Sequence, residues 1–312
     1  MKAESVRNVA VVGAGLMGHG IGAVFALHGK EVTLIDIKPE FLSNAQAQIK
    51  KEFDRCVEGE VMTRAQCDEA LLRIRTTLDM KKAVSEADLV IEAVVEKMDI
   101  KGQVFAEIDR LAPSHAILGS NTSGLPITRI ASYTKRPEKV VGTHFWNPPL
   151  LMRAVEIIRG EKTSDDTVAL IKEVLTGVGK RPVVVSKDVP GQIGIRILYA
   201  MLREAISLVE KGVATSGDVD TIIREALGTR LSILGVLELA DLSGLDLALA
   251  VSGNLFKDLD GSKEPHALLA EKVARGETGV KSGKGFHDWS KRSVQEVIKK
   301  RDEHLMRLLK ET

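Results

Sequence analysis

Short apolar runs alternate with amphipathic stretches through the first 190 residues of this chain. The apolar runs cover residues 9–12, 32–35, 88–94, 116–119, 140–144 and 183–185, and helical spacing covers 39–58, 63–75 and 97–111. Continuous apolar strands between helices are typical of a parallel sheet that is covered on both faces. The pattern therefore predicts an α/β fold whose N-terminal part is a Rossmann-like, doubly wound parallel sheet.

The pattern becomes helical after residue 190. Apolar residues follow a helical period from 195 to 209, and further helices are expected at 218–227, 236–242, 245–255 and 290–309. Ser216 can cap the helix that begins at residue 218. Pro190 and Gly191 interrupt regular structure. We expect two domains, 1–188 with the sheet and 189–312 all-α.

A glycine motif joins the first predicted strand to a helix. The segment Gly13-Ala14-Gly15-Leu16-Met17-Gly18 has G-x-G-x-x-G spacing, and the second predicted strand ends in Asp36. The glycines allow a tight turn and close backbone approach to a pyrophosphate, while an acid at the next strand end binds the ribose hydroxyls. The carboxylate of Asp36 would repel a 2′-phosphate, which favours NAD over NADP, although Lys38 nearby would attract one.

Charge and cysteine content exclude several classes of protein. The 312 residues carry 44 basic and 43 acidic side chains, so no net charge attracts nucleic acid or an anionic membrane. Cys56 and Cys67 have no metal-ligand spacing, and we expect no metal and a reducing, cytoplasmic setting. Neither a signal peptide nor a membrane span is expected. These features indicate an ordinary globular protein that acts on a small molecule.

His144 is the main candidate for chemistry. It ends a predicted strand, where open α/β sheets place their ligand sites, and Glu156 follows within an apolar stretch. A carboxylate between apolar pairs is costly to bury without a partner. A pairing of Glu156 with His144 would orient the ring and stabilise its protonated form, as a general base for a hydroxyl requires. The alternative is a structural histidine beside an exposed glutamate.

The chain resembles the L-3-hydroxyacyl-CoA dehydrogenase family over residues 9–289. The motifs that carry this resemblance occur in the family's order: Gly13 to Gly18, Asp36, 90–96, Ser120-Asn121-Thr122-Ser123, His144-Phe145-Trp146-Asn147-Pro148, and 281–286. The resemblance implies an NAD-dependent oxidoreductase that interconverts a 3-hydroxyacyl-CoA and a 3-ketoacyl-CoA. It also implies which residues form the substrate site and the cofactor site.

In the substrate site, the resemblance makes His144 the general base for the 3-hydroxyl and Glu156 the residue that holds it. Ser123 would hydrogen-bond the reacting oxygen, although a serine there can also cap a helix before Pro126. Asn147 would contact the nicotinamide or the substrate carbonyl.

In the cofactor site, the resemblance implies three charged residues. Glu96 and Lys101 would line the ribose region, and Lys281 would close over the dinucleotide from the C-terminal domain. The alternative for both lysines is a solvated charge.

Four departures from the family pattern concern the substrate. Gln192 replaces an aromatic residue, and Ile195 replaces an asparagine that reaches the active site in the family. CoA-using members often carry a serine and, two turns later, a lysine in the helix after Asp36, where this chain has Glu52 and Gly59. Val236-Leu237 stands where the family prefers proline, and about twenty residues follow Trp289.

These departures leave three functions open. The first is a 3-hydroxyacyl-CoA dehydrogenase, the second is the same chemistry on a free hydroxy acid or ring-bearing alcohol, and the third is a non-catalytic NAD-binding protein. We also expect a homodimer through the helices after Gly191, because the segments 193–209 and 231–249 are strongly apolar for so small a domain.

Overall fold

The computed structural model describes residues 2–311 and divides into two compact units. Unit 1 comprises residues 1–196 together with 300–312, and unit 2 comprises residues 197–299. The expected boundary at residue 188 differs from this division at two places. The segment after residue 188 stays with unit 1 until Arg196, and the chain returns to unit 1 for its last residues.

An eight-stranded sheet with the order β3-β2-β1-β4-β5-β6-β7-β8 forms the centre of unit 1. The strands are β1 (Asn8–Val12), β2 (Glu31–Ile35), β3 (Ile74–Thr77), β4 (Leu89–Glu92), β5 (Ile117–Ser120), β6 (Val140–Phe145), β7 (Ala154–Ile158) and β8 (Arg181–Val185). All neighbouring pairs are parallel except β6 and β7. The sheet is therefore mixed and mostly parallel, and the strand order reverses beside β1.

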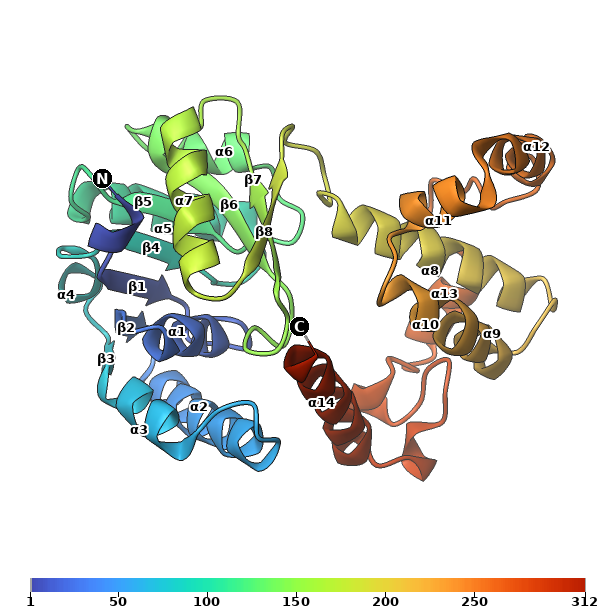
Figure 1. The fold of residues 1–312 in the computed structure, drawn as a ribbon, viewed down its shortest axis with the longest axis horizontal. Coiled ribbons are helices and arrows are strands. Elements are labelled where there is room, and N and C mark those ends of the chain that lie inside the picture. Colours follow the sequence, from blue (N-terminus) through green and yellow to red (C-terminus); the bar gives the residue numbers. More distant parts are fainter. Residues whose placement is uncertain (1, 312) are drawn as a thin grey trace. The chain divides into compact units, whose positions relative to one another are not determined.

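Helices cover both faces of this sheet (Figure 1). One face carries α1 (Gly18–Leu27), α2 (Pro39–Glu58), α3 (Arg64–Leu72) and α7 (Asp165–Gly177), and the other carries α4 (Met80–Val84), α5 (Met98–Leu111) and α6 (Ile127–Ala131). Two apolar clusters fill the layers, one around Phe25 and Phe53 and one around Phe105. The apolar runs predicted as strands lie between these clusters, as expected for a sheet buried on both faces.

Unit 2 consists of helices and loops. It contains most of α8 (Gly194–Glu210), then α9 (Ser216–Ile222), the π-helical η3 (Ile223–Gly228), α10 (Thr229–Leu231), α11 (Val236–Ser243), α12 (Leu245–Leu255), α13 (Ala267–Ala274) and the start of α14 (Val294–Lys310). Thr215, rather than the predicted Ser216, caps α9, because its side chain accepts the Asp218 N–H. Of the described residues 197–299, only Ile206 and Ser207 are buried.

The end of α14 packs on α2 within unit 1. Arg55 donates to Asp302 at 2.7 Å, and Lys310 pairs with Glu60 at 3.1 Å. Between these pairs, Met306 is buried against Cys56 and Leu151. These contacts explain why the last residues of the chain belong to the unit that holds the sheet.

Two predicted elements differ from the observed ones. The helix expected at 63–75 ends at Leu72, and β3 follows at once as the edge strand beside β2. Only four residues long and partly exposed, β3 lacks the apolar run by which the other strands were predicted. The final helix begins at Val294, four residues later than expected.

Candidate active site

The glycine turn after β1 has the geometry of a dinucleotide site. Gly13 has φ +98°, and a Cβ there would lie 2.7 Å from the Ala93 carbonyl oxygen. A Cβ on Gly18 would lie 1.7 Å from the Gly13 carbonyl oxygen, whereas a Cβ on Gly15 would meet nothing within 4 Å. The first and third glycines are thus required by packing, and the second faces open space in front of the helix N-terminus.

Asp36 lies directly beside this turn. Its carboxylate accepts the N–H of Ala14 at 2.8 Å and of Ile37 at 2.7 Å. The residue is only partly buried, so its remaining lone pairs are accessible. Leu16 is 71% exposed and Met17 is partly buried. The turn and the carboxylate together fit the pyrophosphate and ribose of a dinucleotide.

His144 and Glu156 form a buried pair across neighbouring strands. The antiparallel register of β6 and β7 sets the two residues directly opposite each other, and His144 Nδ1 lies 2.7 Å from Glu156 Oε2. Each residue is 4% exposed. A carboxylate only accepts, so Nδ1 carries the proton of this hydrogen bond. Nε2 is therefore the ring nitrogen that can accept a proton from a hydroxyl.

The other oxygen of Glu156 binds the start of α8. Glu156 Oε1 accepts the N–H groups of Ile193 and Gly194 at 2.9 and 3.0 Å. Burial alone would raise the pKa of Glu156, but the hydrogen bonds from His144 and from these two N–H groups outweigh it and hold the pKa below its usual value. The carboxylate stays ionised and keeps the imidazole ring oriented.

Two contacts near His144 were not predicted, one between aromatic rings and one a hydrogen bond. The Trp146 ring lies 5.1 Å from the His144 ring, centroid to centroid, at a tilt of 56°. The side chain of Asn121 accepts the Phe145 N–H at 2.8 Å and so fixes the end of β6. The motif that contains each residue was recognised, but its spacing gave no sign of these contacts.

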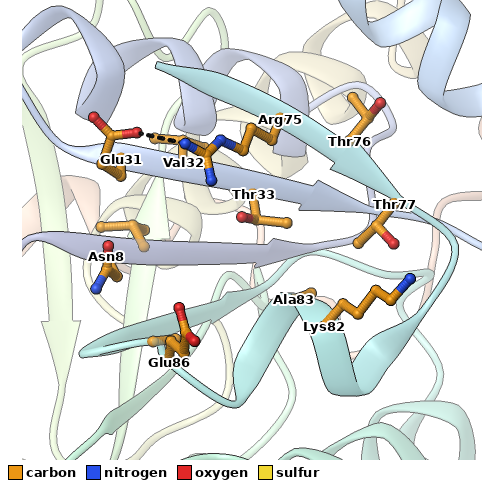
Figure 2. Close-up of a pocket in the computed structure, with 12 residues that line it drawn as sticks. Asn8, Glu31, Val32, Thr33, Arg75, Thr76, Thr77, Lys82, Ala83 and Glu86 are labelled. Carbon is orange, nitrogen blue, oxygen red and sulfur yellow. Dashed lines mark ion pairs between the residues drawn. The ribbon is translucent and has the colours of Figure 1, made fainter.

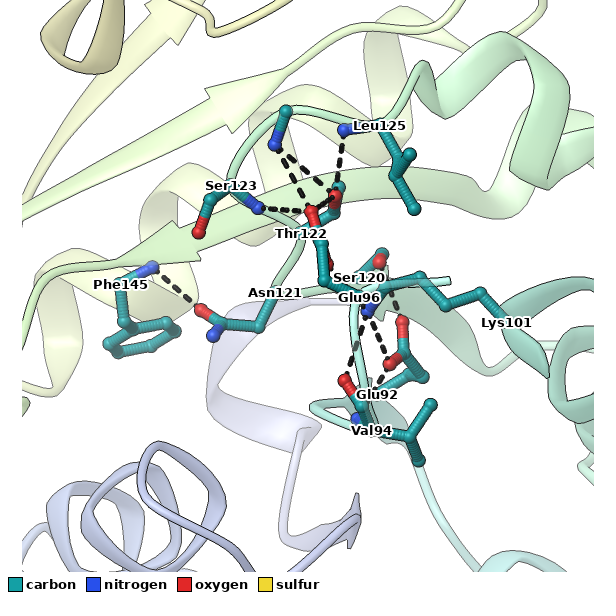
Figure 3. Close-up of polar contacts among 11 residues, drawn as sticks. Glu92, Val94, Glu96, Lys101, Ser120, Asn121, Thr122, Ser123, Leu125 and Phe145 are labelled. Carbon is teal, nitrogen blue, oxygen red and sulfur yellow. Dashed lines mark hydrogen bonds and ion pairs between the residues drawn. The ribbon is translucent and has the colours of Figure 1, made fainter. Parts of the chain in front are cut away.

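A buried charge network lies at the carboxyl ends of β4 and β5 (Figure 3). Glu92 is fully buried and accepts hydrogen bonds from Lys101 Nζ, Ser120 Oγ and the Val94 N–H, each at 2.7 Å. Lys101 is only 1% exposed. An ion pair so deeply buried persists because both charges are fully hydrogen-bonded.

Glu96 extends this network to the segment that carries Ser123. It lies 3.3 Å from Lys101 Nζ, and it accepts the Thr122 hydroxyl and the N–H groups of Ser123 and Gly124. Figure 3 shows the network between the β4 and β5 ends. The Ser123 side chain is exposed, so its hydroxyl is accessible while its backbone is held.

Comparison with known proteins identifies the family. Residues 8–189 match the model of the 3-hydroxyacyl-CoA dehydrogenase NAD binding domain, and residues 191–289 match that of the C-terminal domain. The chain belongs to the 3-hydroxyacyl-CoA dehydrogenase family. It is an NAD-dependent oxidoreductase, as the resemblance predicted.

Relatives within the 3-hydroxyacyl-CoA dehydrogenase family differ in substrate. A 5-formyl-3-hydroxy-2-methylpyridine 4-carboxylate 5-dehydrogenase from Mesorhizobium japonicum is 39% identical over 282 residues, which are 90% of each chain. A probable 3-hydroxybutyryl-CoA dehydrogenase from Bacillus subtilis is 38% identical over 289 residues, 92% of this chain and 99% of the relative. The first relative is named for a pyridine carboxylate, and the second is named for a CoA-linked substrate.

The solved structures that match this chain also include relatives named for both kinds of substrate. A crystal structure of the pyridine 5-dehydrogenase, described as an NAD+-dependent dismutase, matches with a TM-score of 0.91 at 36% identity, over 98% of this chain and 99% of the other. The structure of (S)-3-hydroxybutyryl-CoA dehydrogenase from Ralstonia eutropha matches with a TM-score of 0.77 at 35% identity, over 92% and 100%.

The departures from the family motif after Gly191 lie next to the His144–Glu156 pair. Gln192 has φ +47° and is 1% exposed, and both polar atoms of its amide lack a hydrogen-bond partner among residues 2–311. Ile195 lies in the first turn of α8 and is partly buried. Neither residue can reproduce the aromatic ring and the amide that the family carries at these two positions.

Two site residues implied by the family are exposed. Asn147 follows β6 in the loop that begins at Trp146. Lys281 lies in the glycine-rich loop of unit 2 within the short helix η4 (Val280–Ser282). In the same loop, ion pairs with Lys284 and Lys272 lower the pKa of Glu277 to about 2.

A cavity of about 500 Å³ lies away from these residues (Figure 2). Asn8 and Glu31, the first residues of β1 and β2, line it together with Arg75 and with Lys82 of α4. Ligands of open α/β sheets bind at the carboxyl ends of the strands, and this cavity includes the opposite ends of β1 and β2. We therefore assign no chemistry to it.

The structure of residues 2–311 contains no cluster of three or more His, Cys, Asp or Glu side chains that could hold a metal ion. Within the same residues, no helix is both long and apolar enough to cross a membrane.

Proposed function

We propose that the protein transfers hydride between NAD and a compact hydroxyl or carbonyl compound that carries no coenzyme A. Of the two substrate classes that the sequence left open, the packing of α14 on α2 favours the second. This packing covers Gly59, one of the two positions that the resemblance connects with the CoA carrier.

Both positions expected to contact CoA have other partners. Glu52 Oε1 lies 3.1 Å from His19 Nε2, so this acid is used inside unit 1. A Cβ on Gly59 would lie 2.4 Å from Met306 Sδ, so a lysine there would require the Met306 side chain of α14 to move. Of Lys50, Lys51 and Arg55, which could offset the charge of Glu52 from neighbouring turns, Arg55 is paired with Asp302. The covering helix therefore disfavours a phosphorylated carrier at this end of α2.

The reaction needs one base and one fixed oxygen position. NAD supplies the hydride acceptor, and the protein supplies orientation and proton transfer. We propose that His144 Nε2 takes the hydroxyl proton as the alcohol is oxidised, and returns it when a carbonyl is reduced. Glu156 positions the ring and stabilises the imidazolium. Ser123 would donate to the reacting oxygen, and Asn147 would orient the carbonyl or the nicotinamide amide.

For the cofactor, we propose that the glycine turn holds the pyrophosphate and that Asp36 accepts the adenosine ribose hydroxyls. Lys101 is too deeply buried to serve as an exposed contact, so we propose that it acts by holding Glu96 at the ribose region. Lys281 remains our candidate for closing over the dinucleotide. The free thiols of Cys56 and Cys67 are buried, and burial raises the pKa of Cys56 to about 12, which suits a protein that keeps its thiols reduced.

Steady-state oxidation of NADH by acetoacetyl-CoA and by free acetoacetate tests the substrate proposal. We expect kcat/KM for acetoacetyl-CoA to be no higher than for acetoacetate or for a ring-bearing aldehyde, because the carrier gains no binding energy. A value for acetoacetyl-CoA more than about a hundredfold higher, equal to about 2.7 kcal/mol of binding to the carrier, would contradict the proposal and support the 3-hydroxyacyl-CoA alternative.

Asp36→Ala tests the cofactor preference. The wild type should use NADH with a much higher kcat/KM than NADPH, because the carboxylate repels a 2′-phosphate. The variant should narrow that ratio by about tenfold or more. Asp54→Ala, which removes an exposed carboxylate of α2, is the control and should leave the ratio unchanged. An equal ratio in Asp36→Ala and wild type would remove Asp36 from the ribose site.

We also propose that the protein is a homodimer through unit 2. A unit of 103 residues with two buried residues has no core of its own. Its large apolar side chains are exposed instead, and the most exposed are Val213, Ile222, Ile233, Val236, Leu237, Leu242, Leu245, Leu249 and Phe256. Faces this apolar are usually covered by a partner.

Light scattering at micromolar concentration measures the dimer directly. The chain has a mass of 33.9 kDa, so the dimer should give twice that, about 68 kDa. Leu237→Asp, at one of the exposed positions, should shift the mass toward the monomer. A wild-type mass of one chain would contradict the proposal.

A further inference from the structure

His19 is a buried, titratable neighbour of the glycine turn that the proposed function does not use. It is the second residue of α1 and is only 5% exposed. Its ring Nδ1 lies 2.7 Å from the Gly15 carbonyl oxygen, and its Nε2 lies 3.1 Å from Glu52 Oε1 on α2. The Gly15 carbonyl also accepts the backbone N–H of His19 at 3.3 Å. The side chain therefore links the turn to α2.

The two ring contacts determine the protonation state. A carbonyl oxygen and a carboxylate oxygen can only accept hydrogen bonds, so each ring nitrogen must donate one. A neutral imidazole has one N–H group, and only the imidazolium has two. Both contacts therefore exist together when His19 carries a positive charge. Burial alone would lower the pKa of His19, but the hydrogen bond and charge of Glu52 and the Gly15 carbonyl raise it above the usual 6.5.

Among residues 2–311, His19 is the side chain that pairs with Glu52. Arg55 on the same helix donates to Asp302 at 2.7 Å, and Glu52 Oε2 is buried without a partner among residues 2–311. Besides Glu52 and Arg55, α2 carries the titratable residues Glu40, Lys50, Lys51, Asp54, Cys56 and Glu58, and α3 carries Arg64, Cys67, Asp68 and Glu69. The other titratable groups near α1 are Asp36 beside the turn, His28 at the other end of α1, Glu31 of β2, Arg75 of β3, and Lys180, which bonds the Pro149 carbonyl beside Gly20. Burial raises the pKa values of both thiols, so these stay neutral.

We propose that protonated His19, held by Glu52, is part of the dinucleotide site and makes NAD binding depend on pH. The imidazolium fixes the Gly15 carbonyl away from the ligand and places a positive charge under a turn that binds a pyrophosphate. A bound pyrophosphate stabilises this charge, so the cofactor and the proton on His19 each favour the binding of the other. As pH rises through the His19 titration, both the charge and the second hydrogen bond are lost.

Fluorescence titration of NADH at several pH values tests this proposal at equilibrium, without turnover. The Kd of the wild type should rise about three- to tenfold between pH 6 and pH 9. His19→Ala should bind with the weaker, high-pH affinity throughout and lose most of this dependence. Glu52→Gln should move the midpoint to lower pH, because the amide no longer stabilises the cation. An unchanged pH dependence in His19→Ala would overturn the proposal.

His28→Ala is a matched control on the same helix. Its ring Nδ1 contacts the carbonyl four residues earlier, as in His19, but the structure gives it no carboxylate partner within residues 2–311. This variant should bind NADH with the wild-type pH dependence. It also keeps Lys180, whose pKa is lowered to about 8 by burial and by the charge of Arg153. An equal loss of the dependence in His28→Ala would contradict a specific role of His19.

NMR of the histidine rings gives a readout that is independent of affinity. The chain has seven histidines, and the signal missing from His19→Ala identifies His19. In the free protein this ring should titrate above pH 6.5, and ADP-ribose, which carries the pyrophosphate without the nicotinamide, should move the midpoint higher. A midpoint at or below 6.5 that ADP-ribose leaves unchanged would overturn the proposal even if His19→Ala were unstable.

Discussion

His144→Gln should lower kcat about 10²- to 10⁴-fold, the usual cost of losing a general base. Nε2 of the paired ring is the only atom of the His144–Glu156 pair that can take a hydroxyl proton, and a glutamine amide cannot replace it. The Kd for NADH should change little, because the base acts on the substrate. Stopped-flow turnover with saturating cofactor, beside a fluorescence titration of NADH, measures both quantities.

Two companion variants separate catalysis from folding. Glu156→Gln should lower kcat by a smaller factor and shift the acidic limb of the pH–rate profile to lower pH, since the amide no longer stabilises the imidazolium. His115→Gln changes a histidine whose side chain is half exposed, and should keep wild-type turnover. If His144→Gln kept turnover within about twofold of wild type, the assignment of the base would be wrong.

Lys101→Met should destabilise unit 1 by about 3 to 5 kcal/mol, the cost of leaving a buried charge without its partner. Glu92 is fully buried, and Lys101 is the cation that balances it. The same variant frees Glu96, which holds the backbone at Ser123, so turnover should also fall. Urea unfolding followed by circular dichroism gives the change in the free energy of unfolding.

Arg64→Met is the surface control for Lys101→Met. Arg64 pairs with Asp54 at 2.6 Å, but the two side chains are 50% and 40% exposed. Exposed pairs contribute about 0 to 1 kcal/mol, so this variant should unfold nearly as the wild type does. A loss for Lys101→Met no larger than for Arg64→Met would show that the Glu92 charge is not held by Lys101.

The sequence was most informative where burial is complete. Strands covered on both faces are continuous apolar runs, so β1, β2, β4, β5 and β6 were predicted. The edge strand β8 is partly exposed and was predicted from the apolar run 183–185. The glycine turn has steric requirements that only glycine meets, which is why Gly13 and Gly18 could be assigned from spacing. Glu156 between apolar neighbours required a partner, and β7 supplies it to His144 through the register of an antiparallel pair.

Contacts between distant segments could not be predicted from the sequence. The return of α14 to α2 depends on Asp302 meeting Arg55, which are 247 positions apart. In the sequence, Glu92 is visible only as an acid within an apolar run. Nothing there indicates that Lys101 and Ser120 would form hydrogen bonds with it. His19 directly follows the glycine motif, but its role depends on Glu52 from the next helix.

We propose that this chain carries out the family's hydride chemistry without the family's CoA carrier. Isothermal titration calorimetry of the NADH-bound protein with free coenzyme A tests it most directly, because it measures the carrier site without requiring the true substrate. The packing of α14 on α2 predicts no saturable heat, which corresponds to a Kd weaker than about 1 mM. A saturable isotherm with a Kd of about 10 µM or tighter would contradict the claim.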